Sequence, residues 1–189
     1  MENRINVWAM SLKTRALGPG LRYAIWTQGC LQRCKGCTSP ESRTLEPRLM
    51  LSPSDLAFDI ISRREIEGIT ISGGEPFLQA GPLSEMLSIV RASRPDIDVI
   101  VFSGYPVEVL TWEDARRLLE NTDVLIDGPF EMDKRTDKGL RGSANQRIHF
   151  LTDRLIKHER ELESGPRILE TFIKGNELIT IGIPINNNQ

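Results

Sequence analysis

The sequence contains few of the residues that several common classes of protein require. It has only three cysteines and two histidines in 189 residues, too few for a disulfide framework. No apolar run approaches the length of about 20 residues that a membrane-spanning helix needs. Neither sign of charge predominates, because 24 basic residues face 26 acidic ones and give a formal net charge of -2. Without a cationic excess, the chain lacks the general attraction that holds basic proteins to nucleic acid or to an anionic membrane surface.

The length and the apolar content limit the domain organisation. With 39% hydrophobic residues, 189 residues suffice for one well-buried core and are too few for two ordinary domains. We therefore expect a single domain over residues 1–189, with a core of about residues 17–152 and a C-terminal extension of about residues 153–189. The N-terminal residues have no long apolar core, and three clustered thiols favour a reducing compartment, so we expect a cytoplasmic location.

All three cysteines lie close together, as Cys30, Cys34 and Cys37 in the spacing CxxxCxxC. So tight a spacing on one loop suits metal chelation better than disulfide bonding. A tetrahedral zinc site would need a fourth protein ligand, and the two histidines, His149 and His158, are more than a hundred residues downstream. A cubane iron–sulfur cluster normally takes four cysteines, so three would leave one iron without a protein ligand and open to chemistry.

Strand and helix patterns alternate along the chain. Apolar, β-prone runs predict strands at Ile5–Leu12, Leu21–Thr27, Ile66–Ser72, Ile97–Ser103, Val124–Asp127 and Ile148–Leu151. Helices are predicted from Ser52 as the N-cap with Pro53 at the first position, over Leu83–Val90, over Trp112–Leu119, and over Thr152–Glu163. A C-terminal hairpin is expected from Arg167–Ile173 and Glu177–Ile183, which flank Lys174-Gly175-Asn176.

Repeated strand, loop and helix segments are typical of parallel βα units, and the continuous apolar strands agree with burial on both faces. Five or six strands are too few for a closed eight-stranded barrel, which takes about 250 residues. The predicted fold is therefore α/β, a partial (β/α) barrel of five to six mostly parallel strands with a C-terminal hairpin. Such folds place their sites at the C-terminal ends of the strands, where Cys30, Gly73, Ser103 and Asp127 fall.

Two motifs together resemble the radical S-adenosylmethionine (SAM) superfamily: the CxxxCxxC loop and, after the next strand, Ser72-Gly73-Gly74-Glu75-Pro76. Further landmarks resemble the activating proteins of anaerobic ribonucleoside-triphosphate reductases, and the likeness runs from about Leu17 to Pro184. These landmarks are Leu17-Gly18-Pro19-Gly20-Leu21-Arg22, Thr27-Gln28-Gly29-Cys30, Asp127-Gly128-Pro129-Phe130, Arg141-Gly142-Ser143-Ala144-Asn145-Gln146-Arg147 and Gly182-Ile183-Pro184.

The resemblance implies two cofactors, a 4Fe–4S cluster and SAM. Cys30, Cys34 and Cys37 would hold three irons, and SAM would chelate the fourth iron through its amino and carboxylate groups. The resemblance further implies that the backbone of Gly36 to Thr38 lies along the adenine and that Gly73, Gly74 and Glu75 contact the methionyl amino group. It implies contacts of Ser103 and Asp127 with the ribose or the substrate. Arg141 would lie at the SAM carboxylate or in the substrate channel.

The resemblance also implies the reaction and the partners. Reductive cleavage of SAM gives methionine and a 5′-deoxyadenosyl radical, which abstracts hydrogen from a target, and no side chain need act as an acid or a base. The target would be a backbone glycine of the anaerobic reductase, whose glycyl radical is stored. Flavodoxin or ferredoxin would supply the electrons, and neither nucleic acid nor a membrane is expected as a partner.

Some alternatives remain open at the level of sequence. Ser103 and Asp127 can equally satisfy local turn backbone, and the segment 141–147 can be a structured turn. Gly36 replaces the commoner aromatic residue of the superfamily, and Thr38-Ser39 replaces the Phe-Asn that usually precedes Pro-Glu. A related radical SAM enzyme acting on a peptide or a 7-carboxy-7-deazaguanine-type heterocycle is therefore one alternative, and a non-catalytic zinc-binding interaction module is another. We assign the tryptophans, Trp8, Trp26 and Trp112, to the core or an interface.

Overall fold

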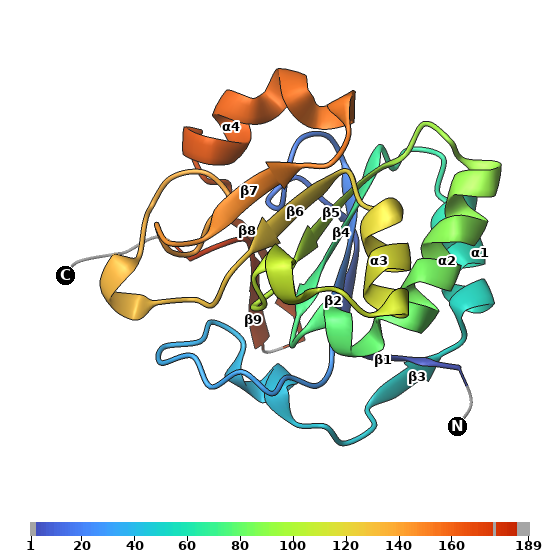
Figure 1. The fold of residues 1–189 in the computed structure, drawn as a ribbon, viewed down its shortest axis with the longest axis horizontal. Helices are drawn as coiled ribbons and strands as arrows, with labels where there is room; N and C mark the ends of the chain where they lie inside the picture. The colour runs from blue at the N-terminus through green and yellow to red at the C-terminus, as the bar shows by residue number, and fades with distance from the viewer. Residues whose placement is uncertain (1–2, 176, 185–189) are drawn as a thin grey trace.

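The computed structural model describes residues 3–175 and 177–184, and its centre is a seven-stranded sheet (Figure 1). The strand order is β3-β1-β2-β4-β5-β6-β7. The four central strands β2, β4, β5 and β6 are parallel, and β1, β3 and β7 are antiparallel to their neighbours. The bounds are β1 Ile5–Thr14, β2 Arg22–Thr27, β3 Leu49–Leu51, β4 Gly68–Gly73, β5 Asp98–Phe102, β6 Val124–Asp127 and β7 Arg147–Phe150.

The α/β class and the parallel centre of the sheet are as predicted, but the predicted count of five to six strands is too low. Three of the six pairings between neighbouring strands are antiparallel, and the prediction missed β3. Leu49 and Met50 in β3 are exposed, so the segment has no buried face that would give it a recognisable pattern. Within the described residues the sheet is open, with β3 at one edge and β7 at the other.

Three helices cover one face of the sheet (Figure 1), α1 Pro53–Ser62, α2 Ala80–Ser93 and α3 Glu113–Glu120. The predicted start of α1 is confirmed, because Ser52 Oγ accepts a hydrogen bond from the backbone N of Asp55 at 3.1 Å. The predicted apolar stripe of α2, Leu83, Met86, Leu87 and Val90, is fully buried in the main core. No helix among the described residues is long and apolar enough to cross a bilayer.

The opposite face of the sheet faces the C-terminal segments. Side chains alternate between the two faces of a strand, so Ile25 packs in the main core while Ala24 and Trp26 face the other way. The predicted C-terminal hairpin is present as β8 Glu170–Lys174 and β9 Glu177–Ile181, although Asn176 in its turn lies outside the described residues. Ile181 of the hairpin packs with Ala24 on this face.

Short helices complete the connections. The predicted helix over Thr152–Glu163 is divided into a 3-10 helix, η5 Asp153–His158, and α4 Glu159–Ser164, which bury Leu155 and Leu162. The other 3-10 helices are η1 Pro40–Arg43, η2 Pro76–Gln79, η3 Val107–Val109 and η4 Met132–Lys134.

Candidate functional site

A cavity of about 950 Å³ lies on the face of the sheet away from the three helices, at the C-terminal ends of the parallel strands. Segments that follow β2, β4, β5 and β6 line it, and residues 179–184 of the C-terminal segment line its far wall. The predicted site residues that it brings together are Cys30, Cys34, Cys37, Thr38, Gly73, Gly74, Glu75 and Ser103. Gly36, Asp127 and Arg141 are not among its lining residues.

The cysteine loop begins where β2 ends and closes back on its own start. Gly29 turns the chain with a positive φ of 107°, and its backbone N donates to Ser42 O at 2.7 Å. The backbone N of Cys30 then donates to Arg43 O at 3.0 Å. These two bonds hold residues 30–43 as one closed loop over the cavity.

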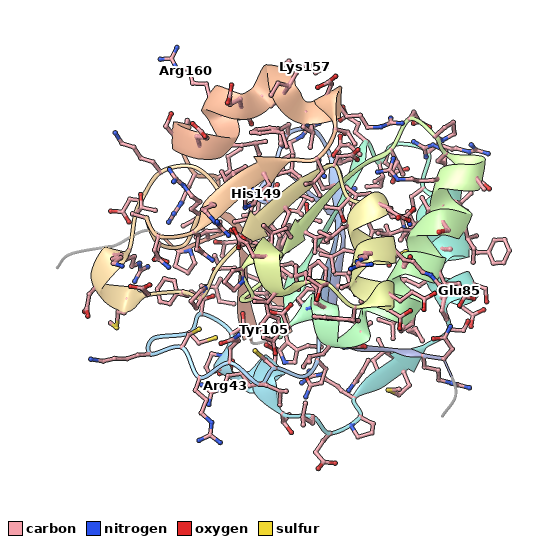
Figure 2. The ribbon with its side chains drawn as sticks, viewed as in Figure 1. Arg43, Glu85, Tyr105, His149, Lys157 and Arg160 are labelled. Carbon is pink, nitrogen blue, oxygen red and sulfur yellow. The ribbon has the colours of Figure 1, made fainter. Side chains whose placement is uncertain are left out.

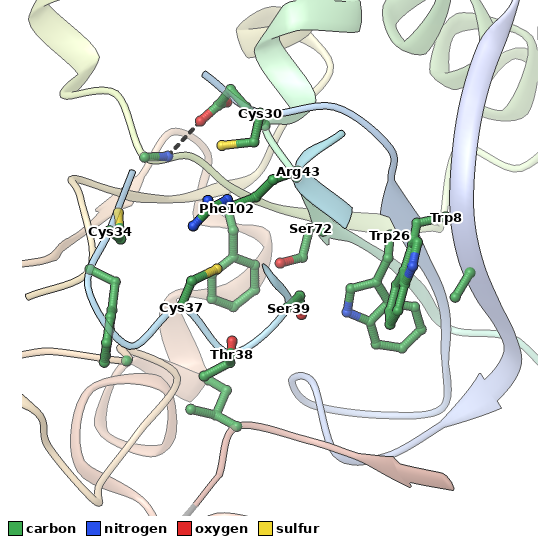
Figure 3. Close-up of a pocket in the computed structure, with 18 of the residues that line it drawn as sticks. Trp8, Trp26, Cys30, Cys34, Cys37, Thr38, Ser39, Arg43, Ser72 and Phe102 are labelled. Carbon is green, nitrogen blue, oxygen red and sulfur yellow. Dashed lines mark hydrogen bonds between the residues drawn. The ribbon is translucent and has the colours of Figure 1, made fainter. Parts of the chain in front are cut away.

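The three cysteines are free and half-buried, and Figure 3 shows them on one side of the cavity. Burial raises the pKa of the Cys30 thiol above its usual value. The described residues contain no group of three His, Cys, Asp or Glu side chains close enough to share one metal ion. A cubane cluster instead gives each thiolate a different iron. The three thiols on one cavity wall therefore fit the donor set of such a cluster.

The paired glycines bring the end of β4 against the start of the cysteine loop. A Cβ on Gly74 would lie 2.2 Å from Gly29 O, and a Cβ on Gly73 would lie 2.3 Å from Thr27 N. The close approach is used for hydrogen bonds, since Gly74 N donates to Thr27 O and Glu75 N donates to Gly29 O, both at 2.8 Å. The glycines thus allow two backbone segments to meet, and their backbone also lines the cavity.

The Glu75 side chain is fully buried and already accepts three hydrogen bonds. Its donors are the backbone N of Phe77 at 3.0 Å, Ser103 Oγ at 3.0 Å and the backbone N of Gly104 at 2.7 Å. Burial raises the pKa of Glu75 to about 7, although these bonds oppose the shift. The carboxylate therefore links the end of β4 to the end of β5, and Ser103 takes part in the same link.

Asp127 is buried at the end of β6 in an ion-pair network. Its Oδ1 accepts from Arg147 Nε at 3.0 Å, and its Oδ2 accepts from the backbone N of Val107 at 2.6 Å. His149 lies on β7 (Figure 2), with its Nε2 3.1 Å from the same carboxylate. Burial alone would raise the pKa of Asp127, but the hydrogen bonds from Arg147 and Val107 outweigh it and lower the pKa. Asp127 thus anchors the sheet edge to the loop after β5.

The segment 141–147 forms a structured turn. Gln146 accepts from the backbone N of Gly142 at 2.7 Å and donates to Gly128 O at 3.0 Å. Arg141 points to carbonyl oxygens of Gln146 and Glu163, at 3.5 and 3.4 Å. Gly142 and Gln146 reach the cavity, whereas Arg141 does not.

The sequence did not identify several residues that line the cavity. Arg43, Phe102, Trp8 and Trp26 belong to this group, and Figure 3 shows the Arg43 side chain extending towards the cysteines. No local pattern marks Arg43, because only the closure of residues 30–43 brings it to the cavity. Phe102 and Trp26 could have been assigned from the alternation of side chains along buried strands.

A match to a protein-family model gives the class of this protein. The family model described as "4Fe-4S single cluster domain" matches residues 16–149, which include the three cysteines. The chain is also similar to proteins named anaerobic ribonucleoside-triphosphate reductase-activating protein. The phage T4 protein is 34% identical over 149 residues, with 75% of this chain and 92% of the phage protein covered. The Vibrio cholerae serotype O1 protein is 35% identical over 150 residues, with 71% and 91% covered.

These matches show the family, and they confirm the resemblance that the motifs indicated. The chain belongs to the family of anaerobic ribonucleoside-triphosphate reductase-activating proteins, which the matched model places among proteins with a single 4Fe–4S cluster. The Escherichia coli K12 member is 29% identical over 148 residues, with 71% of this chain and 91% of that protein covered.

Proposed function

We propose that this protein is a radical SAM enzyme that generates the glycyl radical of an anaerobic ribonucleoside-triphosphate reductase. The observation that carries this proposal is the meeting of three free cysteines and the Gly73-Gly74 backbone on one cavity. The names of its relatives supply the target, because each is called an activating protein of that reductase.

The proposed roles follow the positions of the residues. Cys30, Cys34 and Cys37 hold the cluster, and the backbone of Gly73 and Gly74 receives the methionyl amino group of SAM. When bound, these cofactors supply the one-electron cleavage of SAM to methionine and a carbon radical that takes a hydrogen atom from the target. The chain itself orients the cofactors and excludes water, and none of its side chains has to transfer a proton.

The remaining predicted residues have supporting roles in this proposal. Glu75 and Ser103 fix the ends of β4 and β5 relative to each other, and both line the cavity that would hold the cofactor. Thr38, which lines the cavity, places loop backbone along the adenine, and Gly36 lets the loop turn there with a positive φ of 72°. Asp127 and Arg141 act from outside the cavity. Asp127 binds Arg147, the residue after Gln146, and Arg141 donates to Gln146 O.

The proposal extends to the setting of the enzyme. Residues 1–189 act as a single radical SAM domain, and its sheet serves as a partial (β/α) barrel around the cofactors. Flavodoxin or ferredoxin provides the electron, and the reaction takes place in a reducing cytoplasm.

The direct test is anaerobic incubation of the reconstituted protein with SAM, dithionite and an anaerobic reductase, followed by electron paramagnetic resonance. A glycyl doublet on the reductase is the expected result. Consumption of SAM without the doublet would favour an enzyme acting on another peptide or on a 7-carboxy-7-deazaguanine-type heterocycle. One zinc per chain without iron and acid-labile sulfide would instead indicate the interaction module.

A further inference from the structure

Two tryptophans form the end of the cavity that lies away from the cysteines. Figure 3 shows Trp8 and Trp26 at this end, with Ser39 and Ser72 between them and Cys37. Trp8 comes from β1 and Trp26 from β2, and both side chains are half-buried. The sequence assigned them to the core or an interface, and the proposed cofactor contacts leave them without a role.

Alternation along β1 and β2 places both tryptophans on the cavity side of the sheet. Val7 lies in the main core, so the next residue, Trp8, faces the opposite side, as Trp26 does after Ile25. A bulge at this point leaves Trp8 without a partner in β2, because Val7 pairs with Thr27 and Ala9 pairs with Trp26. Val7 remains in the main core, while Trp8 and Trp26 both line the cavity.

The indoles have contact surface that the protein leaves unused. Among the described residues the aromatic ring pair is Phe77 with Trp112, so Trp8 and Trp26 do not stack on each other. Trp8 Nε1 is buried and has no hydrogen-bond partner in the part of the chain that the structure describes. The guanidinium carbon of Arg48 lies 5.7 Å from the centroid of the Trp8 ring, which fixes the ring from one side.

Apolar residues of the C-terminal segments also line the cavity. Leu169 and Ile179 are among them and are 41% and 39% exposed, so they have surface left for a ligand. The whole cavity, about 950 Å³, is at the upper end of the range of roughly 300–1,000 Å³ for small-molecule sites. It therefore has room for a group of the substrate in addition to the cofactor.

We propose that Trp8 and Trp26 form a binding subsite for an aromatic side chain next to the reacting glycine of the target polypeptide. This inference rests on the proposed function. A glycine offers no side chain for recognition, so its neighbours must supply the contacts that hold it in place. Two rigid, half-buried indoles suit an aromatic ring, because such rings pair edge to face or in offset stacks.

The test uses the full chain with its cluster and SAM but without a reductant, so that binding is measured without turnover. The probes are two capped peptides, Ac-Ala-Ala-Gly-Phe-Ala-Ala-NH₂ and the same peptide with alanine in place of phenylalanine. Calorimetry should give an affinity for the phenylalanine peptide about tenfold higher than for the alanine peptide. Trp8→Ala and Trp26→Ala should each remove this preference.

Trp112→Ala is the matched control, because Trp112 is outside the cavity and packs edge to face on Phe77. It should leave the preference unchanged. Trp8→Phe, which keeps a ring, should retain most of the preference even if Trp8→Ala does not fold.

Equal affinity for the two peptides, or equal effects of all the tryptophan variants, would overturn the proposal. Displacement of the phenylalanine peptide by free pterin, with no preference between the peptides, would also overturn it and indicate a heterocycle subsite. Failure to cleave SAM would refute the proposed function but would leave the measured preference intact.

Discussion

Ser103 Oγ donates a hydrogen bond to Glu75 Oε1 at 3.0 Å, and this bond joins the ends of the parallel strands β4 and β5 at the cavity. Both residues are buried, and the backbone N of Gly104 donates to the other carboxylate oxygen at 2.7 Å. Glu75, the last residue of the Ser-Gly-Gly-Glu motif, therefore links the ends of two strands through hydrogen bonds. The motif thus holds the ends of β4 and β5 together at the cavity.

Replacing Glu75 by alanine should destabilise the fold. The change leaves the buried N–H groups of Phe77 and Gly104 and the Ser103 hydroxyl without their acceptor, which should cost about 2–4 kcal/mol of unfolding free energy. Urea unfolding measures the loss. Glu65→Ala is the matched control, because Glu65 is exposed and should change the value by less than about 0.5 kcal/mol. Similar effects of the two variants would show that the hydrogen bonds of Glu75 do not contribute to the unfolding free energy.

The stability of the protein should fall with rising pH because of Glu75. Its pKa is about 7 in the folded state against an ordinary value of 4.5, so the folded state binds more protons between these values. Stability falls with pH wherever the folded state binds more protons than the unfolded state. The stabilising effect of this group is complete below pH 4.5 and is lost as the pH rises to about 7.

Glu75→Gln removes the titration and should remove this contribution to the slope. Urea unfolding gives the unfolding free energy of both proteins at about pH 5, 6, 7 and 8. In the difference between the two proteins at each pH, the contributions of the other titrating groups cancel. The unfolding free energy of the wild-type protein should fall more steeply than that of the variant. Parallel curves would contradict the raised pKa.

Gly74→Ala should prevent the cysteine loop from closing. The new Cβ would lie 2.2 Å from Gly29 O, a backbone atom that can move only with the loop itself. The variant should lose most of the iron and sulfide that the parent protein takes up on reconstitution. Gly81→Ala is the control, because its Cβ would meet the end of the flexible Asp114 side chain at 3.0 Å. Full iron loading of Gly74→Ala would exclude this role of the glycine.

Cys34→Ala should abolish cluster binding. Two remaining thiolates would leave a second iron without a protein ligand, and a cubane is held by its cysteines. Iron analysis and the visible absorption of anaerobically reconstituted protein measure the effect. An undiminished brown chromophore in the variant would refute the assignment of Cys34 as a ligand.

The sequence predicted the elements that have strong local signals. The parallel strands are continuous apolar runs, and α1 begins at a Ser-Pro pair whose capping bond is present. The cysteine spacing and the glycine pair also indicated residues that meet on one cavity. β3 was missed, because its three residues have no buried face and are held by pairing with β1.

The partners of the site residues were beyond sequence reasoning, because they come from distant segments. Nothing in the sequence near Asp127 indicates that Arg147 binds it. Likewise, nothing near Arg141 indicates that its guanidinium donates to Glu163 O. The side that Trp8 faces follows from the alternation of β1, since Ile5 and Val7 lie in the main core, but the cavity that it lines is formed by distant segments.

The central claim is tested most directly by reductive cleavage of SAM. The full chain is reconstituted anaerobically with iron and sulfide, then incubated with SAM and dithionite, and 5′-deoxyadenosine and methionine are measured by chromatography. The account predicts that both products appear in equal amounts with the wild-type protein and that neither appears with Cys34→Ala. A colourless wild-type protein that leaves SAM intact would contradict it.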